Sequence, residues 1–251
     1  MKRNMKQWMQ EVLDAPVKRA MPVLSFPAIQ LMDITVRDLI CSSDLQSKGM
    51  KLVADRVPSA AAVSLMDLSV EAECFGSQIR FSDDEVPTVV GALVSSAEEV
   101  EALKVPAVGA GRTGIYIESI EKALKLIEDR PVFAGVIGPF SLAGRLMDVT
   151  EAMIYCYEEP EMVSALMDKV TEFLIAYCSA YKQVGANGVV LAEPLAGLLS
   201  PALAEEFSAP YVKKIVDAVQ SNDFLVVYHN CGNAAIQMID SILDTGAAMF
   251  H

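Results

Sequence analysis

The stretch Phe224-Leu-Val-Val-Tyr-His-Asn-Cys-Gly232 carries the pattern on which the fold assignment depends. Its first five residues are all apolar or aromatic, which predicts a short strand that is buried on both faces. His229 and Cys231 follow the end of this apolar run, and Gly232 beside them permits a tight turn out of the strand. Because side chains alternate across a strand, we expect His229 and Cys231 to point to the same side.

Five more stretches of this kind occur along the chain, and segments with helical periodicity separate them. The predicted strands cover residues 21–27, 61–66, 132–138, 188–193 and 246–250. The predicted helices include residues 5–13, 36–56, 117–128, 139–157, 160–184 and 234–243, and a small hairpin is expected within residues 75–87. Buried strands that alternate with helices indicate a parallel sheet.

Polar or acidic residues stand at the ends of several predicted strands, as in an α/β barrel. We therefore predict an α/β fold of the (β/α)8 TIM-barrel type, truncated after about six β/α units, with residues 1–251 forming a single domain. A doubly wound sheet is the alternative. No Gly-x-Gly-x-x-Gly follows any predicted strand, so the dinucleotide-binding version of that fold lacks its phosphate loop.

The composition excludes several classes of function. The formal net charge is −13 and no Lys/Arg cluster occurs, so nucleic acid is not an expected partner. The longest apolar stretches fall well short of the roughly 20 residues that span a bilayer, and the N-terminus lacks a signal-peptide core. We expect a cytoplasmic protein without a membrane segment. The five cysteines have no paired spacing, which argues for reduced thiols.

An imidazole and a thiolate at the mouth of one strand are suitable zinc ligands. His229 and Cys231 are thus predicted to supply two ligands of a zinc site. The alternative is a hydrogen-bonded core histidine beside a buried cysteine.

Several motifs, in their order and spacing, resemble the uroporphyrinogen decarboxylase superfamily, and His-x-Cys-Gly-Asn at 229–233 resembles its methylcobamide:coenzyme M methyltransferase branch. These motifs are Met-Asp-Leu-Ser-Val-Glu-Ala-Glu-Cys-Phe-Gly at 66–76, Asp-Asp-Glu-Val-Pro at 83–87, Gly-Pro-Phe-Ser-Leu-Ala-Gly at 138–144, Gly-Ala-Asn-Gly-Val-Val-Leu-Ala-Glu-Pro at 185–194 and Leu-Ser-Pro at 199–201. The decarboxylases recognise their substrate through an arginine-rich segment after the first strand, where this chain has Ala-Ile-Gln-Leu-Met-Asp at 28–33. The resemblance therefore favours a methyltransferase over a decarboxylase.

The resemblance implies a zinc-dependent transfer of a methyl group from a methylated corrinoid (a methylcobamide) to a thiol such as coenzyme M. The corrinoid would arrive on a separate carrier protein, and a homo-oligomer is possible. By this resemblance, His229 and Cys231 would bind zinc together with a second cysteine near the last barrel strand. In this sequence, however, no cysteine follows Cys231. A catalytically incomplete barrel that binds a corrinoid protein or another subunit is the alternative. The methyl acceptor stays open between coenzyme M, tetrahydrofolate and another thiol.

Four further residues are candidates for the site. Asp67 ends the second predicted strand and matches an acid of the superfamily motif, so it is a candidate to orient substrate; capping a turn is the alternative. Glu193 ends the fourth strand and is a candidate zinc ligand or partner of His229, unless it merely terminates the strand. Gly138 and Ser141 begin a helix whose amides can meet an anionic substrate group such as a sulfonate, although Ser141 can also act as a plain helix cap.

Overall fold

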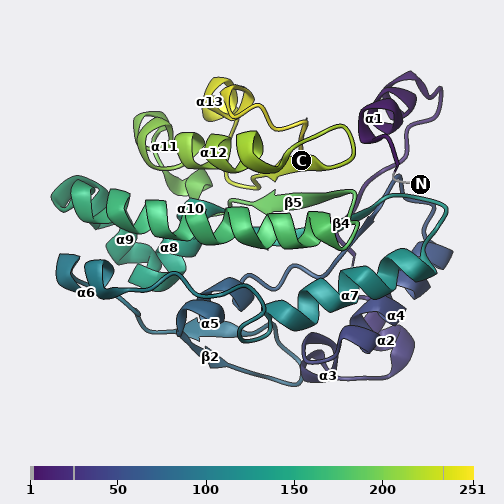
Figure 1. The fold of residues 1–251 in the computed structure, drawn as a ribbon, viewed down its shortest axis with the longest axis horizontal. Coiled ribbons are helices and arrows are strands. Elements are labelled where there is room, and N and C mark those ends of the chain that lie inside the picture. The colour runs from purple at the N-terminus through teal and green to yellow at the C-terminus, as the bar shows by residue number, and fades with distance from the viewer. Residues whose placement is uncertain (1–2, 25, 234) are drawn as a thin grey trace.

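The central element of the molecule is a parallel sheet of five strands (Figure 1). The structure is a computed structural model and describes residues 3–24, 26–233 and 235–251. The strands lie in the order β1-β4-β5-β6-β7, with bounds β1 (Ala62–Val63), β4 (Val132–Ile137), β5 (Gly188–Ala192), β6 (Leu225–His229) and β7 (Met249–Phe250). A separate antiparallel hairpin joins β2 (Gln78–Arg80) to β3 (Thr88–Val90).

The order of the strands identifies the architecture. Each strand of the sheet lies beside the previous and the next one along the chain, and every pairing is parallel. Right-handed crossovers that all proceed in one direction place their helices on one face of the sheet, as in the wall of a barrel. A doubly wound sheet reverses its strand order, and this sheet does not. The predicted α/β fold of the barrel type is thus confirmed.

Helices form most of the remaining structure. Their bounds are α1 (Met5–Asp14), α2 (Ala28–Met32), α3 (Val36–Ile40), α4 (Ser43–Arg56), α5 (Val70–Phe75), α6 (Ala97–Ala102), α7 (Thr113–Leu126), α8 (Pro139–Met147), α9 (Val149–Glu158), α10 (Pro160–Gln183), α11 (Pro201–Phe207), α12 (Ala209–Val219) and α13 (Ile239–Asp244), with 3-10 turns η1 (Ala196–Leu198) and η2 (Ala235–Met238). Within the described ranges, none of these helices combines the length and apolarity needed to cross a membrane.

The structure corrects several predicted elements. No strand forms in the described part of residues 21–27, where Pro22 and Pro27 cannot donate the amide bonds of a ladder; residue 25 lies outside the described residues. The helix predicted over 36–56 is two helices, because the Ser42 side chain accepts a bond from Leu45 N and begins α4. The helix predicted over 139–157 divides at Asp148, which has a φ of 77°.

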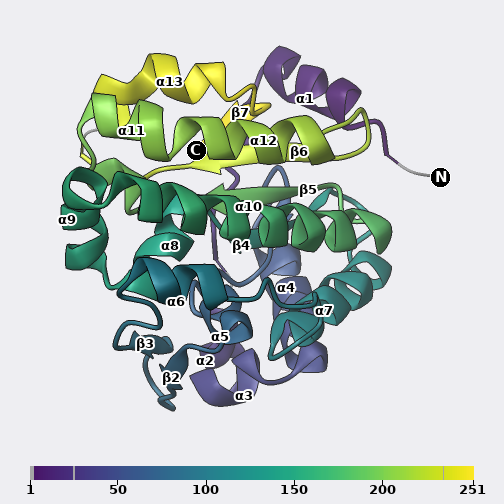
Figure 2. The same cartoon turned by 60° about the vertical axis from the view of Figure 1, so that its left-hand side comes forward.

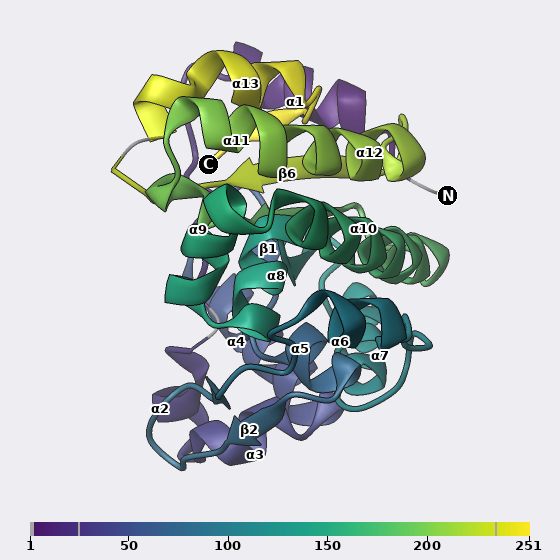
Figure 3. The same cartoon turned by 90° about the vertical axis from the view of Figure 1, so that its left-hand side faces the viewer.

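The sheet has two differently covered faces. Helices such as α10 and α12 cover the outer face (Figure 2), where Ala134 and Val136 of β4 are buried. The inner face carries Leu225 and Val227 of β6 in a smaller apolar cluster with α1. His229 follows these residues at the same two-residue spacing, so it belongs to the inner face. Figure 3 shows α13 and α1 at one end of the molecule and α2, α3 and β2 at the other.

Candidate functional site

The predicted site residues lie at the carboxyl ends of the parallel strands. His229 is the last residue of β6, and Glu193 directly follows β5. Asp67 comes four residues after β1, and Gly138 links β4 to α8. Because parallel strands end at the same edge of a sheet, these residues share the edge at which barrel enzymes hold their active sites.

The imidazole of His229 faces that of His251, the residue after β7. Their Nδ1 atoms are 2.9 Å apart, and Nε2 of His251 lies 3.0 Å from the carbonyl oxygen of Met21. A carbonyl oxygen only accepts, so Nε2 of His251 carries the proton and a neutral His251 presents a lone pair on Nδ1. His229 then donates from Nδ1, which leaves the lone pair of its Nε2 available to a ligand.

Burial is the main reason that the pKa of His229 is lowered, and a positive charge on His251, when that ring is protonated, acts in the same direction. Both effects favour the neutral imidazole, which is the form that binds a metal ion.

Cys231 is an exposed free thiol in the loop that follows β6. The side chain of buried Asn230 shapes this loop, because its Oδ1 accepts a bond of 2.9 Å from Gly232 N. The nitrogen and sulfur donors of His229 and Cys231 suit zinc. Within residues 3–24, 26–233 and 235–251, however, no group of three or more His, Cys, Asp or Glu side chains is arranged to hold a metal ion. The described residues thus offer two suitable donors and not a complete ligand set.

Glu193, Gly138 and Ser141 form one buried cluster. The Glu193 carboxylate accepts bonds from Phe140 N (2.8 Å), Ser141 N (2.9 Å) and Ser141 Oγ (2.7 Å) at the start of α8. A Cβ atom on Gly138 would lie 2.7 Å from Glu193 Oε1 and nearer still to Cγ and Cδ, so only glycine leaves room for this carboxylate. The amides predicted to meet a substrate anion are therefore occupied by Glu193.

The surroundings of Glu193 determine the pKa of its carboxyl and the direction of its side chain. Burial raises the pKa of the Glu193 carboxyl to about 7, although the bonds from Ser141 and Phe140 oppose the shift. Its backbone N donates a bond of 2.8 Å to the carbonyl oxygen of His229. Glu193 thus contacts His229 through the backbone, while its side chain is directed to α8.

Asp67 lies in a second buried cluster. Its Oδ1 accepts bonds from Ser69 N (3.1 Å) and Ser69 Oγ (2.6 Å), and its Oδ2 accepts a bond of 3.0 Å from Tyr116 OH. Arg112 forms an ion pair with Oδ2 and a second pair of 2.6 Å with Glu73. Burial opposes the charge of Arg112, but Asp67 and Glu73 hold the pKa of the guanidinium above its usual value.

Sequence reasoning missed Arg112 and Tyr116 because they are 45 and 49 residues from Asp67. The Gly-Arg-Thr at 111–113 carries no local signal of a buried ion pair, and the packing of α7 against β4 and α5 brings these residues to Asp67.

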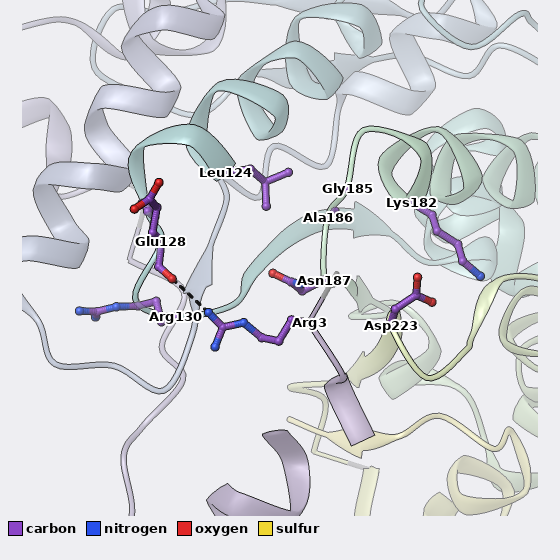
Figure 4. Close-up of a pocket in the computed structure, with 10 residues that line it drawn as sticks. Arg3, Leu124, Glu128, Arg130, Lys182, Gly185, Ala186, Asn187 and Asp223 are labelled. Carbon is purple, nitrogen blue, oxygen red and sulfur yellow. Dashed lines mark hydrogen bonds between the residues drawn. The ribbon is translucent and has the colours of Figure 1, made fainter. Parts of the chain in front are cut away.

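Two cavities differ in where they lie relative to the carboxyl ends of the parallel strands. One of about 240 Å³ lies beside Asp67 and includes Arg145 of α8 in its lining. A larger one of about 520 Å³ lies at the opposite ends of β4 and β5 (Figure 4). Its cations already have partners: Arg3, for example, donates to the Glu128 carbonyl oxygen at 3.1 Å, and Lys182 donates to the Val219 carbonyl oxygen at 2.7 Å. Of these two cavities, the smaller one borders a predicted site residue, Asp67, and none of the other predicted site residues is part of its lining.

Comparison with known proteins relates the chain to a family. The family model described as "Uroporphyrinogen decarboxylase (URO-D)" matches residues 10–251. The protein named "Methylcobamide:CoM methyltransferase MtbA" from Methanosarcina acetivorans is 35% identical, over 66% of this chain and 50% of its own length. Its namesake from Methanosarcina mazei is 34% identical with the same coverage, and a "Uroporphyrinogen decarboxylase" from Myxococcus xanthus is 27% identical over 80% of this chain and 59% of its own length.

A solved structure described as "methyltransferase from Methanosarcina mazei" has a TM-score of 0.85 and 23% identity. It matches 98% of this chain and 75% of its own, which supports the fold. The chain spans about half the length of the MtbA relatives that it matches.

Proposed function

The chain belongs to the uroporphyrinogen decarboxylase (URO-D) family, and on that premise we propose that it moves a methyl group from a protein-bound methylated corrinoid to a thiol. The observation that carries the proposal is the half-buried His229, which faces the inner side of the sheet edge with a free Nε2 lone pair and is followed by Cys231. The similarity to the two MtbA proteins supports the same chemistry.

In this proposal His229 and Cys231 hold a zinc ion through Nε2 and Sγ. When bound, zinc makes a coordinated thiol a thiolate at neutral pH. The chain's own contribution is to keep His229 neutral and oriented through His251, and to present Cys231 in a loop shaped by Asn230.

The proposed reaction balances without an added oxidant or reductant. The thiol loses its proton to solvent, and its sulfur forms a bond to the methyl carbon. The cobalt–carbon bond breaks, and its electron pair stays on cobalt. A carrier protein that presents the corrinoid is the expected transient partner.

The two buried clusters are proposed to support this chemistry in different ways. Asp67 would orient substrate at the cavity that it lines, with Arg112 and Tyr116 fixing its carboxylate. Glu193, seated on Gly138 and Ser141, would act on the reaction by holding the end of β5 against His229.

A second candidate function is a barrel that binds a corrinoid protein or another subunit without catalysis. The absence of a third donor beside His229 and Cys231, in the part of the chain that the structure describes, is the observation that favours it.

Demethylation of methylcobalamin, followed by its visible spectrum, tests the proposal. The chain is assayed with 2-mercaptoethanesulfonate, and zinc content is measured in parallel for the unsubstituted protein, His229→Ala and Cys231→Ser. Cys41→Ser is the matched control, because Cys41 is another exposed free thiol. The proposal expects about one zinc per chain and activity in the unsubstituted protein and the control, and loss of both in the two site variants. Equal zinc content and rates in all four proteins would refute it.

A further inference from the structure

Two glycines bring the loops after β5 and β6 into direct backbone contact. Gly197 lies in η1, which follows β5, and Gly232 follows Cys231 in the loop after β6. A Cβ atom added to Gly197 would lie 2.6 Å from the Cα of Gly232. One added to Gly232 would lie 2.8 Å from the carbonyl oxygen of Gly197 and nearer still to its Cα. The contact therefore excludes a side chain at either position.

Steric contact, and not backbone conformation, requires glycine at these two positions. Neither Gly197 nor Gly232 has a φ in the left-handed region that favours glycine. Most of the atoms that a Cβ would meet belong to the main chain, which cannot rotate away as the end of a flexible side chain can. A substitution at either glycine must therefore push the two loops apart.

The side chain of Asn230 connects the same contact to β6. Its Oδ1 accepts a bond of 2.9 Å from Gly232 N, and its Nδ2 donates a bond of 3.4 Å to the hydroxyl oxygen of Tyr228. Asn230 is buried, and its backbone N donates a bond of 3.3 Å to the carbonyl oxygen of His251. A Cβ on Gly197 would also lie 2.5 Å from Asn230 Oδ1. Gly197 thus packs against both residues that flank Cys231.

Cys231 has little of its own to hold it in place, because it is exposed. Its position depends on its two neighbours, Asn230 and Gly232, and both of them are fixed. With the main chain held on either side, rotation about the Cα–Cβ bond is the freedom that remains to the sulfur.

The segment after β5 holds the main chain of β6 at a second point. The backbone N of Glu193 donates a bond of 2.8 Å to the carbonyl oxygen of His229. One contact therefore fixes the residue that carries the imidazole, and the Gly197 contact fixes the loop that carries the thiol.

We propose that Gly197 is a positioning residue, whose backbone contact with Gly232 fixes the sulfur of Cys231 relative to the imidazole of His229. The inference rests on the proposed function, because it explains how the chain holds one of the two proposed zinc donors. Gly197 itself touches no reacting atom. Its effect passes through the main chain of the loop, as with other outer contacts that orient metal ligands.

Zinc affinity, measured by competition with a chromophoric chelator, tests the effect on the metal. Removing an outer contact that orients a ligand weakens metal binding by about 10–100-fold, so Gly197→Ala should weaken zinc binding by at least about 10-fold. In the cobalt(II)-substituted protein it should also reduce the thiolate-to-cobalt charge-transfer absorption. Leu198→Ala, in the same 3-10 turn at a side chain that is 62% exposed, is the matched control and should change neither value.

Amide hydrogen exchange of the metal-free protein tests the contact itself. The Gly232 N–H donates to Asn230 Oδ1, and it should exchange about 10-fold faster in Gly197→Ala than in the unsubstituted chain. Asn230→Ala removes this bond without adding an atom. It should speed the same exchange and weaken zinc binding, and it provides the test if Gly197→Ala does not fold.

Neither measurement depends on methyl transfer, so the inference and the proposed function can fail separately. If no thiol demethylates methylcobalamin but Gly197→Ala shows both changes, the proposed function fails and the positioning role stands. Unchanged zinc affinity and unchanged Gly232 exchange in Gly197→Ala would overturn the positioning role and leave the proposed function standing. A lower free energy of unfolding, with the zinc affinity and cobalt spectrum of the folded protein unchanged, would also overturn it, because Gly197 would then be merely structural.

Discussion

Replacing Gly138 with alanine should break the buried cluster around Glu193. The glycine has φ −82° and ψ 164°, an extended conformation that alanine adopts without strain. Backbone entropy alone would therefore predict that the substitution stabilises the protein by about 0.4–1 kcal/mol. The added Cβ, however, would lie 2.7 Å from Glu193 Oε1 and closer to two carbons of the same side chain. The steric and entropic arguments thus predict changes of opposite sign in the free energy of unfolding.

The size of the loss in stability follows from the hydrogen bonds that the Glu193 carboxylate can no longer accept. Non-bonded carbon atoms pack at about 3.5–4.0 Å, so the Glu193 carboxylate has to move by roughly 1 Å or more. It then loses bonds to Phe140 and Ser141 that are now 2.7–2.9 Å long. Leaving a buried polar group without its hydrogen bonds costs about 1–3 kcal/mol, and more where the group is charged. We expect Gly138→Ala to lower the free energy of unfolding by about 3 kcal/mol.

Urea unfolding at pH 7, followed by circular dichroism, measures this loss. The matched control is the same substitution in a Glu193→Ala background, where no carboxylate is left to displace. There Gly138→Ala should change the unfolding free energy by less than about 1 kcal/mol. A stabilised single variant, or an equal loss in both backgrounds, would refute the steric reasoning.

Three other predictions concern the site. Nitrogen-15 NMR of the two histidine rings should show His229 protonated on Nδ1 and His251 on Nε2, and His251→Ala should abolish the preference of His229; a predominant Nε2–H form of His229 in the unsubstituted chain would contradict the arrangement. Arg112→Gln should lower the unfolding free energy by about 3–5 kcal/mol because it leaves Asp67 buried without its cation, and a loss below 1 kcal/mol in urea unfolding would count against that role. Burial raises the pKa of Glu193 to about 7 from an unfolded value near 4.5, so its contribution to stability is complete below pH 4.5 and is lost as pH rises to 7. Glu193→Gln should accordingly reduce the fall in stability between pH 5 and pH 7 by about 2 kcal/mol, and an unchanged pH profile would show that Glu193 is already ionised at pH 5.

Local patterns of the sequence were enough to predict many of the strands and helices. The strands predicted at 132–138, 188–193 and 224–228 appear within one residue of β4, β5 and β6, and the helix predicted over 160–184 is α10. These elements are predictable because a continuous apolar run, or an apolar residue on every helical turn, is a property of neighbouring residues. The same local pattern predicted that His229 would stand at the end of a buried strand.

The pairings around the site depended on the tertiary structure. Glu193 meets the first turn of α8 across 52 residues, Asp67 meets Arg112 across 45, and His229 meets His251 across 22. Sheet register and helix packing decide such contacts, and no window of sequence contains both partners. For the same reason the sequence predicted a helix start that receives a substrate anion, whereas in the fold this helix start binds the carboxylate of Glu193. Burial, which exists only after the chain has folded, then shifted the pKa values of Glu193 and His229.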